Sequence, residues 1–566
     1  MSKPRRRKKA VCVRKLSSYD HAGNVPARND NLLPVTPEET IEPLIHAGAV
    51  EVLAENQRIS TAGMTTKVVK GSMWTLAGQV LPMFASLVTA PIIIRLLGAE
   101  SYGVLILVGI IPNYFSFADF GMGMASTKFA SEAYSRGDRA AEADAVRTAA
   151  FIAFLAASAI ALPILMFAST IIAELNVPDA LKPTATLALR FTSLTFIVAI
   201  LSNVFNTPQL SRLRMDINAA VNAAGKIVGA AGSAVVLYLG GGIAGAAAYL
   251  FFVSALGLGA HIMVSGHLLR DIYHIRIDRR LLKPLLRFGS GLMIAGIAAI
   301  FLINIEKLLV TRLISVESLA FYSIAFTFAN MAAMFSWSMV QSLIPAFSQL
   351  LSPEKRSQFD SLFSRGIRLS IIWLLPTLMV LFVIAKPFFT IWAGAEFGRQ
   401  SPGPFYVLLI GLLFNVVAYV PYSALVASSR TGLIAKIHSA ELIPYAIAAA
   451  VLISYFGIVG AALAWSLRVV FDSGLFLWLA RSVIGVHTEF RRTAMASLVG
   501  LLVLSPSVFI AAFYNNYSPL LIIMAPASLA LYSFVVWRYF VTDDERHWFV
   551  DKLPVQFRSL ALRFTN

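Results

Sequence analysis

The sequence has little of what soluble enzymes and secreted proteins are built from. Only one of its 566 residues, Cys12, is a cysteine, which excludes a disulfide framework and any metal site made from cysteine ligands. Charged residues make up 14% of the chain and hydrophobic residues 57%, whereas soluble domains carry about 25% charged residues. The composition therefore excludes an ordinary globular protein.

Catalytic and nucleotide-binding motifs are also missing. No G-x-x-x-x-G-K-[ST] loop occurs, since Gly225-Lys226 is followed by Ile227 inside an apolar run. The sequence contains no H-E-x-x-H zinc motif and no G-x-S-x-G nucleophile turn. We therefore expect neither an enzyme nor an ATP-driven pump, and we expect no cofactor and no metal ion.

Apolar runs long enough to cross a bilayer recur along the chain from Gly71 to Val541. They predict an all-α polytopic membrane protein with about fourteen transmembrane helices. The expected spans are 71–97, 102–124, 148–173, 184–206, 217–239, 243–266, 288–313, 319–345, 368–394, 404–427, 434–455, 458–480, 493–514 and 519–541.

The middle of the chain repeats itself at a lag of about 215–218 residues. Arg95-Leu96 recurs as Arg312-Leu313, and Glu100-Ser101 recurs as Glu317-Ser318. The segment GIAGAA at 242–247 returns as GIVGAA at 457–462. Six spans per copy give both copies the same orientation, which predicts two parallel six-helix lobes and an extra C-terminal helix pair.

The expected organisation follows from this repeat and from the polar ends of the chain. Residues 1–66 are predicted to be a disordered basic tail, with a short amphipathic helix between Glu38 and Asn56. The N-lobe is expected at 67–283 and the C-lobe at 284–485. The extra pair is expected at 486–541 and a C-terminal tail at 542–566.

The net charge of +17 is interpreted as a topology signal and not as a nucleic-acid-binding surface. Most Lys and Arg residues lie in the loops after even-numbered spans and in the two tails. Because cytoplasmic loops carry the excess of positive charge, both termini are predicted to be cytoplasmic. Spans five and six, which meet at Gly240–Gly242, and spans eleven and twelve, which meet at Gly457, are expected to form tight hairpins.

Ionisable residues inside the spans are the candidate functional residues, because a charge in the bilayer is costly unless it is paired or hydrated. Lys226, Lys307, Arg190 and Arg468 are the candidates for a cationic cavity that would bind an anionic substrate such as a diphosphate. For Lys226 and Arg190 the alternative is snorkelling to the interface. For Arg468 the alternative is neutralisation by Asp472, one helical turn later.

Acidic residues in the spans are candidates for binding a coupling proton or sodium ion. They are Asp119 and Glu306. Solvation at the interface is the alternative for Asp119. Glu306 and its neighbour Lys307 are about 100° apart on a helix, so they must point in different directions. At the ends of the repeated spans, Arg95, Arg312, Glu100 and Glu317 are expected to anchor hairpins and not to contact substrate.

Several motifs resemble a known family. KGSMW at 70–74 and RLLGAESYG at 95–103 resemble the start of the polysaccharide (O-antigen) flippases, within the multidrug/oligosaccharidyl-lipid/polysaccharide exporter superfamily. Glu306-Lys307, followed by Arg312-Leu313, resembles the counterpart in the second copy, where the family usually has Asp in place of Glu306. The resemblance covers about residues 67–485.

The resemblance implies a secondary transporter of the bacterial cytoplasmic (inner) membrane. It would move an undecaprenyl-diphosphate-linked oligosaccharide to the outer leaflet for exopolysaccharide, capsule or O-antigen synthesis, by alternating access and with ion coupling. Expected partners are the lipid-linked oligosaccharide, the membrane, a polysaccharide polymerase and glycosyltransferases. The alternatives are a multidrug or cation antiporter, a lipid II flippase, and a non-transporting scaffold for glycosyltransferases.

Overall fold

The computed structural model describes residues 42–119, 121–274, 276–486, 490–511 and 519–542, together with Arg546. The described residues are overwhelmingly helical and include no strand. The chain divides into two units, residues 1–66 and residues 67–566. In the first unit, residues 42–66 are helical. This stretch overlaps the short amphipathic helix predicted between Glu38 and Asn56, whereas disorder is predicted for residues 57–66. The stretch has no proline after Pro43 and is rich in Ala, Glu and Val, a composition compatible with a helix. The rest of the predicted N-terminal tail lies outside the described residues.

The first copy of the repeat begins with one long helix that contains the first predicted span and the first part of the second. This helix departs from helical geometry at Gly98, where φ is 77° and ψ is 169°. The helical elements of this copy are α1 (Glu42–Asn113), η1 (Ser116–Asp119), α2 (Met122–Ser135), α3 (Arg139–Met166), α4 (Ala168–Ala173), η2 (Asp179–Leu181), α5 (Lys182–Phe205), α6 (Thr207–Ser211), α7 (Met215–Tyr238), α8 (Gly242–Leu268) and η3 (Arg270–Tyr273).

The second copy and the extra pair are also built from helices. Spans eleven and twelve lie in one assigned helix, which departs from helical geometry at Gly457, where φ is 59° and ψ is −139°. The elements are α9 (Arg279–Leu313), α10 (Val316–Ser348), η4 (Pro353–Lys355), α11 (Arg356–Ala393), α12 (Ala395–Gln400), α13 (Pro402–Ala427), α14 (Thr431–Leu479), η5 (Ala480–Ile484), α15 (Phe490–Phe509) and α16 (Pro519–Tyr539).

The repeated glycines mark equivalent turns in the two copies. Gly242 and Gly457 both have positive φ, 61° and 59°, a region that glycine enters without a Cβ penalty. After Gly457 the chain returns so closely that a Cβ added to Gly460 would lie 1.9 Å from the carbonyl oxygen of Leu452. The tight turn predicted at Gly457 is therefore confirmed, and it requires glycine at positions 457 and 460.

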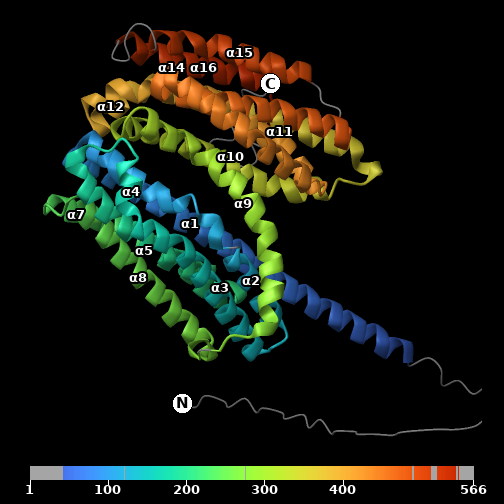
Figure 1. Ribbon diagram of the computed structural model, residues 1–566. Helices are drawn as coiled ribbons and strands as arrows, with labels where there is room; N and C mark the ends of the chain where they lie inside the picture. Colours follow the sequence, from blue (N-terminus) through green and yellow to red (C-terminus); the bar gives the residue numbers. More distant parts are fainter. Residues whose placement is uncertain are drawn as a thin grey trace, which may run out of the picture. The chain divides into compact units, whose positions relative to one another are not determined.

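Each copy packs around the helix that occupies its fourth span. In the first copy α5 packs against α3 and α8, and α7 packs against α8 (Figure 1). In the second copy α13 packs against α10, α11 and α14. The extra pair, α15 and α16, packs against α11, where the hydroxyl of Tyr532 donates a hydrogen bond to the carbonyl of Ile372 at 2.8 Å. The extra pair is therefore attached to the second lobe.

The helices agree with a multi-pass membrane protein. Among the described residues nine helices are long and apolar enough to cross a membrane. Two of these, α1 from Ala77 onward and α14 with η5, each overlap two predicted spans. Helices α9, α10 and α15 overlap three further predicted spans. The total of fourteen stays a prediction.

Two predicted boundaries differ from the structure. The expected span 102–124 is interrupted, because α1 ends at Asn113 and α2 begins at Met122. Pro112 supplies no N–H to the helix, and Gly121 takes a left-handed φ of 61° just before α2. The expected lobe boundary after residue 283 falls inside α9, which begins at Arg279 and packs against α2 and α3 as well as α10 and α14.

Candidate functional site

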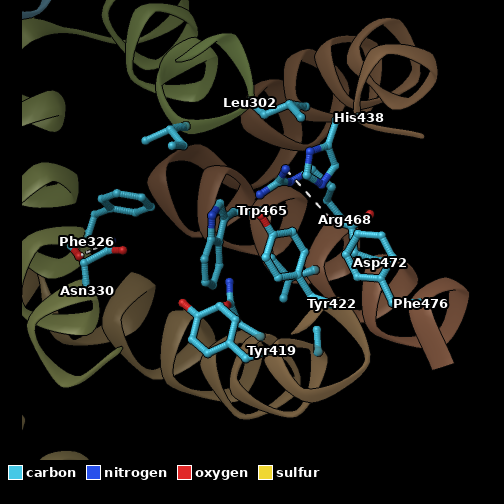
Figure 2. Close-up of a pocket in the computed structure, with 14 residues that line it drawn as sticks. Leu302, Phe326, Asn330, Tyr419, Tyr422, His438, Trp465, Arg468, Asp472 and Phe476 are labelled. Carbon is cyan, nitrogen blue, oxygen red and sulfur yellow. Dashed lines mark hydrogen bonds and ion pairs between the residues drawn. The ribbon is translucent and has the colours of Figure 1, made fainter. Parts of the chain in front are cut away.

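The second lobe contains a cavity of about 320 Å³ that is bounded by α9, α10, α13 and α14. Aromatic rings form much of its wall and a few polar side chains reach into it (Figure 2). We call it the aromatic cavity. It is lined by Leu302, Ile303, Phe326, Asn330, Asn415, Ala418, Tyr419, Tyr422, His438, Trp465, Arg468, Val469, Asp472 and Phe476.

Helix α14 supplies the charged residues of the aromatic cavity. Arg468 and Asp472 are one turn apart, and Nη1 of Arg468 lies 3.9 Å from Oδ2 of Asp472, with both side chains at least 88% buried. The Arg468 guanidinium also lies 5.2 Å from the ring centroid of Tyr445. The dashed line in Figure 2 marks the ion pair. The structure confirms the predicted pairing, yet leaves Arg468 on the cavity wall.

A second acidic residue of α14 lies beside this pair. Nε2 of His438 is 3.9 Å from Oε1 of Glu441, and ligand atoms of His438, Glu441 and Asp472 all lie within 4.8 Å of one another. Within the described part of the chain, neither carboxylate oxygen of Glu441 has a hydrogen-bond partner. Two buried carboxylates this close repel each other unless a proton or a cation neutralises one of them. This is the group of described residues that could hold a cation, whereas the sequence predicts no metal site.

Glu306 and Lys307 of α9 point to different partners, as their helical spacing predicts. Glu306 is fully buried and accepts hydrogen bonds from the hydroxyls of Tyr445 at 3.0 Å and Tyr322 at 3.5 Å. Nζ of Lys307 donates to Oδ1 of Asn304 at 2.9 Å. It also lies 4.5 Å from the ring centroid of Phe326 on the cavity wall, a cation–π contact.

The other predicted intramembrane residues lie elsewhere. Lys226 on α7 and Arg190 on α5 are exposed and belong to the first lobe, so neither lines the aromatic cavity. Of the four cations predicted to share one cavity, Arg468 lines the aromatic cavity and Lys307 contacts its wall through Phe326. Asp119 ends η1, and its Oδ1 accepts a hydrogen bond from the backbone N–H of Gly121 at 2.7 Å. It thereby stabilises the turn that interrupts the second span.

The arginines predicted to anchor hairpins instead join the two lobes. Nη2 of Arg95, on α1, donates to the carbonyl of Ile391, on α11, at 2.6 Å. Nη1 of Arg312, on α9, lies 3.5 Å from Oε2 of Glu174, which follows α4. At the same ends of the helices, a Cβ added to Gly103 would lie 1.8 Å from the carbonyl oxygen of Val316. The lobes are therefore in contact at the ends that the charge pattern predicts to face outward.

The two predicted glutamates of these ends lie near each other. Glu317 stands in the first turn of α10, just before the expected span. Partial burial, then the negative charges of Glu396 and Glu100, raise the pKa of the Glu317 carboxyl. The negative charge of Glu100 is therefore felt by Glu317 across the repeat, and the role of the two glutamates at hairpin ends stays a prediction.

Sequence reasoning missed the neutral polar groups of the network. Tyr322, Tyr445 and Asn304 bind Glu306 or Lys307, and His438 faces Glu441. The phenols lie inside apolar runs, where tyrosine is ordinary. Their one available signal is the buried carboxylate of Glu306, which requires hydrogen-bond donors somewhere in the fold.

The fold defines the class of protein. The structure is similar to that of "Lipid II flippase MurJ, inward closed conformation", with a TM-score of 0.65 and 13% identity over 84% of this chain and 100% of that chain. It is also similar to the inward-facing conformation of a multidrug-resistance MATE transporter of the MOP superfamily. That TM-score is 0.58, with 12% identity over 73% of this chain and 98% of that one. The chain therefore has the fold of these membrane transporters.

The sequence places it within a family of that class. Residues 68–351 match the model of the polysaccharide biosynthesis protein family, and the chain belongs to this family, which confirms the resemblance found in the motifs. It is 22% identical over 423 residues to a putative O-antigen transporter of Shigella flexneri, covering 74% of this chain and 99% of that protein. It is 22% identical over 223 residues to the probable low-salt glycan biosynthesis flippase Agl15 of Haloferax volcanii, covering 39% and 46%.

Proposed function

We propose that this protein is a flippase that moves a polyprenyl-diphosphate-linked oligosaccharide between membrane leaflets for surface polysaccharide synthesis. The observation that carries the proposal is a pair of partly buried cations at an aromatic cavity, Arg468 in its lining and Lys307 against its wall, in a chain of the polysaccharide biosynthesis family. Cations in a low-dielectric site bind diphosphate strongly, and aromatic faces pack against sugar rings and prenyl chains.

The two lobes supply the movement. Contacts of Arg95 and Arg312 hold the lobes together at one end, so the state described here is closed on the side predicted to face outward. Release of the substrate on that side requires both contacts to break while the opposite ends approach. Lys226 and Arg190, exposed on the first lobe, are proposed to contact the substrate diphosphate when the lobes change position.

A cation is proposed to drive the cycle. Glu306, Glu441 and Asp472 are buried acids that gain from binding a proton or a sodium ion. Asp119 is the weaker candidate, because its carboxylate already accepts a hydrogen bond from Gly121. Neutralisation of Glu306 would weaken the hydrogen bond that its carboxylate accepts from the Tyr445 hydroxyl. This would weaken the contact between α9 and α14.

The location follows from the same reasoning. We place the protein in the bacterial inner membrane with both termini in the cytoplasm, because positive charge collects in the tails and in the loops after even-numbered spans. A polysaccharide polymerase and glycosyltransferases are its proposed partners, since they consume and supply the lipid-linked repeat unit.

Transport in a defined membrane tests the function. The full chain is reconstituted in vesicles that contain a fluorescent polyprenyl-diphosphate oligosaccharide, and a membrane-impermeant quencher reports its transfer between leaflets. We expect Lys307→Gln with Arg468→Gln to reduce the rate at least tenfold, while Arg430→Gln, at an exposed position, leaves it unchanged. Wild-type transfer no faster than in empty vesicles, together with normal surface polysaccharide in a deletion strain, would overturn the proposal. Drug sensitivity of that strain without a polysaccharide defect would favour an antiporter.

A further inference from the structure

A second cavity, of about 660 Å³, lies between α2 and the first turns of α9. It is separate from the aromatic cavity and shares no lining residue with it. Four of the seven side chains that line it are cationic and none is acidic. We call it the basic pocket. Its lining is Lys128, Phe129, Arg280, Lys283, Pro284, Arg287 and Phe288.

One wall of the basic pocket is formed by a stripe of cationic residues on α9. Arg280, Lys283 and Arg287 are spaced i, i+3 and i+7, so they lie on one face of α9. The helix starts there because Oδ1 of Asp278 accepts a hydrogen bond from the backbone N–H of Arg280 at 2.9 Å. A cation in the first turn of a helix is unfavourable for the helix dipole, so helix stability does not account for Arg280.

Helix α2 supplies the opposite wall. Nζ of Lys128 lies 5.0 Å from the ring centroid of Phe129 and 4.9 Å from that of Phe288. The two rings contact edge to face, with centroids 6.4 Å apart. The ammonium is thus held between two phenyl faces, facing the stripe on α9 across the pocket.

Three cations of the pocket, Lys128, Arg280 and Lys283, have little compensating negative charge. Lys128 lies 4.0 Å from Glu132, but both side chains are about half exposed, and such an exposed pair is weak. Arg280 and Lys283 are exposed and have no ion pair within the described part of the chain. The pocket therefore concentrates positive potential and has room for an anion.

Its surroundings indicate an anion that carries an apolar chain. The pocket lies at the ends of helices where the charge pattern predicts the cytoplasmic face, close to the start of the expected span at residue 288. Phe129, Pro284 and Phe288 belong to its lining. Basic pockets between transmembrane helices at this depth suit lipid phosphate groups, whereas a soluble anion would gain nothing from the apolar residues.

We propose that the basic pocket binds the phosphate headgroup of an anionic lipid from the leaflet on this side of the membrane. The phosphate would lie between Lys128 and the stripe of Arg280, Lys283 and Arg287, with the first carbons of the lipid against Pro284 and Phe288. Two lipids offer this chemistry, an anionic phospholipid and the polyprenyl diphosphate of the proposed substrate. Binding to this pocket does not require that the protein transports anything.

Native mass spectrometry of the purified full chain tests the site. Phosphatidylglycerol and a polyprenyl diphosphate are titrated in separate arms, with zwitterionic phosphatidylcholine as the comparison lipid. The test variant is Arg280→Gln with Lys283→Gln. The matched control is Arg276→Gln with Arg279→Gln, which removes the same charge from exposed neighbours that do not line the pocket.

We expect the test variant to bind the anionic lipid about 10- to 30-fold more weakly, since each basic residue near a lipid surface contributes about 1 kcal/mol, while the control keeps wild-type affinity. A loss confined to phosphatidylglycerol identifies a phospholipid site, and a loss confined to polyprenyl diphosphate identifies a substrate site. Equal losses in the test and control variants, or no loss in either arm, overturn the proposal. Thermal unfolding of each variant confirms that it is folded.

Discussion

The guanidinium of Arg95 donates to the carbonyl of Ile391 at 2.6 Å, and the repeat reproduces this contact in reverse. The same lag of 217 residues separates Arg95 from Arg312 and Glu174 from Ile391. In one lobe the arginine reaches a backbone carbonyl, and in the other it reaches the Glu174 carboxylate at 3.5 Å. The duplication has therefore produced two related clasps between the lobes, each made by an arginine of one lobe and the equivalent position of the other.

Removing both clasps is expected to open the lobes at this end. In a Cys12→Ser background, spin labels at Asp179 and Arg399 measure the separation by electron resonance. We expect Arg95→Ala with Arg312→Ala to shift the population toward longer distances by about three- to tenfold, because each exposed contact contributes about 1 kcal/mol or less. The exposed Arg430→Ala serves as the control. An unchanged distance distribution in the double variant contradicts the clasp.

Tyr445→Phe is expected to destabilise the network around Glu306. It removes the 3.0 Å donor to a fully buried carboxylate, which costs about 1–3 kcal/mol, and it should alter the dependence of transport on the coupling ion. Tyr455→Phe is the matched control, since Tyr455 is 80% exposed. Thermal unfolding and transport in vesicles at several proton and sodium gradients provide the two measurements. Equal behaviour of the two variants would show that the Tyr445 hydroxyl is dispensable.

Arg468 and Asp472 are expected to be energetically coupled. Arg468→Gln leaves Asp472 close to Glu441 without its cation, and breaking such a buried pair costs about 3–5 kcal/mol. Asp472→Asn in the same chain removes the uncompensated charge, so the double variant should recover about 1–3 kcal/mol. A double-mutant cycle by thermal unfolding measures this coupling. Additive single effects would mean that the 3.9 Å pair contributes nothing.

Glu317 is expected to make stability depend on pH. Its pKa is raised in the folded protein by partial burial and by Glu396 and Glu100, so the folded state binds the proton more readily than the unfolded state. The resulting stability is full below the unfolded pKa and is lost as pH rises through the raised folded pKa. We expect the melting temperature of Glu317→Gln to increase relative to that of the wild type as the pH rises from 4 to 8. The exposed Glu354→Gln should show no such trend.

Gly460→Ala is expected to disturb the turn at Gly457. A Cβ at position 460 would lie 1.9 Å from the carbonyl oxygen of Leu452, and such overpacking costs about 1–3 kcal/mol or more. Gly474→Ala in the same α14 meets no atom within 4 Å and should be neutral or slightly stabilising. Thermal unfolding of the two variants separates close packing from a general effect of alanine. Equal melting temperatures would contradict the close approach.

Local patterns in the sequence predict the features that depend on neighbouring residues. The ion pair of Arg468 with Asp472 follows from a spacing of one turn, and the turn at Gly457 follows from the repeated glycines. The contact of Glu306 with Tyr445 joins residues 139 positions apart, and that of Arg95 with Ile391 joins residues 296 apart. Such pairs depend on how the helices pack against one another. The spacing of residues within an apolar sequence does not reveal that packing.

The direction in which an intramembrane cation points is not predicted by the sequence for a related reason. Lys226 and Arg190 stand in helices that are largely apolar, where periodicity distinguishes a lipid-facing side from an interior one poorly. The structure shows that Lys226 and Arg190 are exposed on their helices, whereas Arg468 lines the aromatic cavity and Lys307 contacts its wall.

Helix α9 has 35 residues, which at 1.5 Å per residue makes it about 50 Å long, well beyond the roughly 30 Å of hydrocarbon in a bilayer. It begins at the basic pocket and carries Glu306 and Lys307 near its other end. A rod of this length acts as a lever across the membrane. A tilt about its middle that shifts its first turns in one leaflet moves Glu306 and Lys307 in the opposite direction, so lipid composition on one side would affect these two residues on the other.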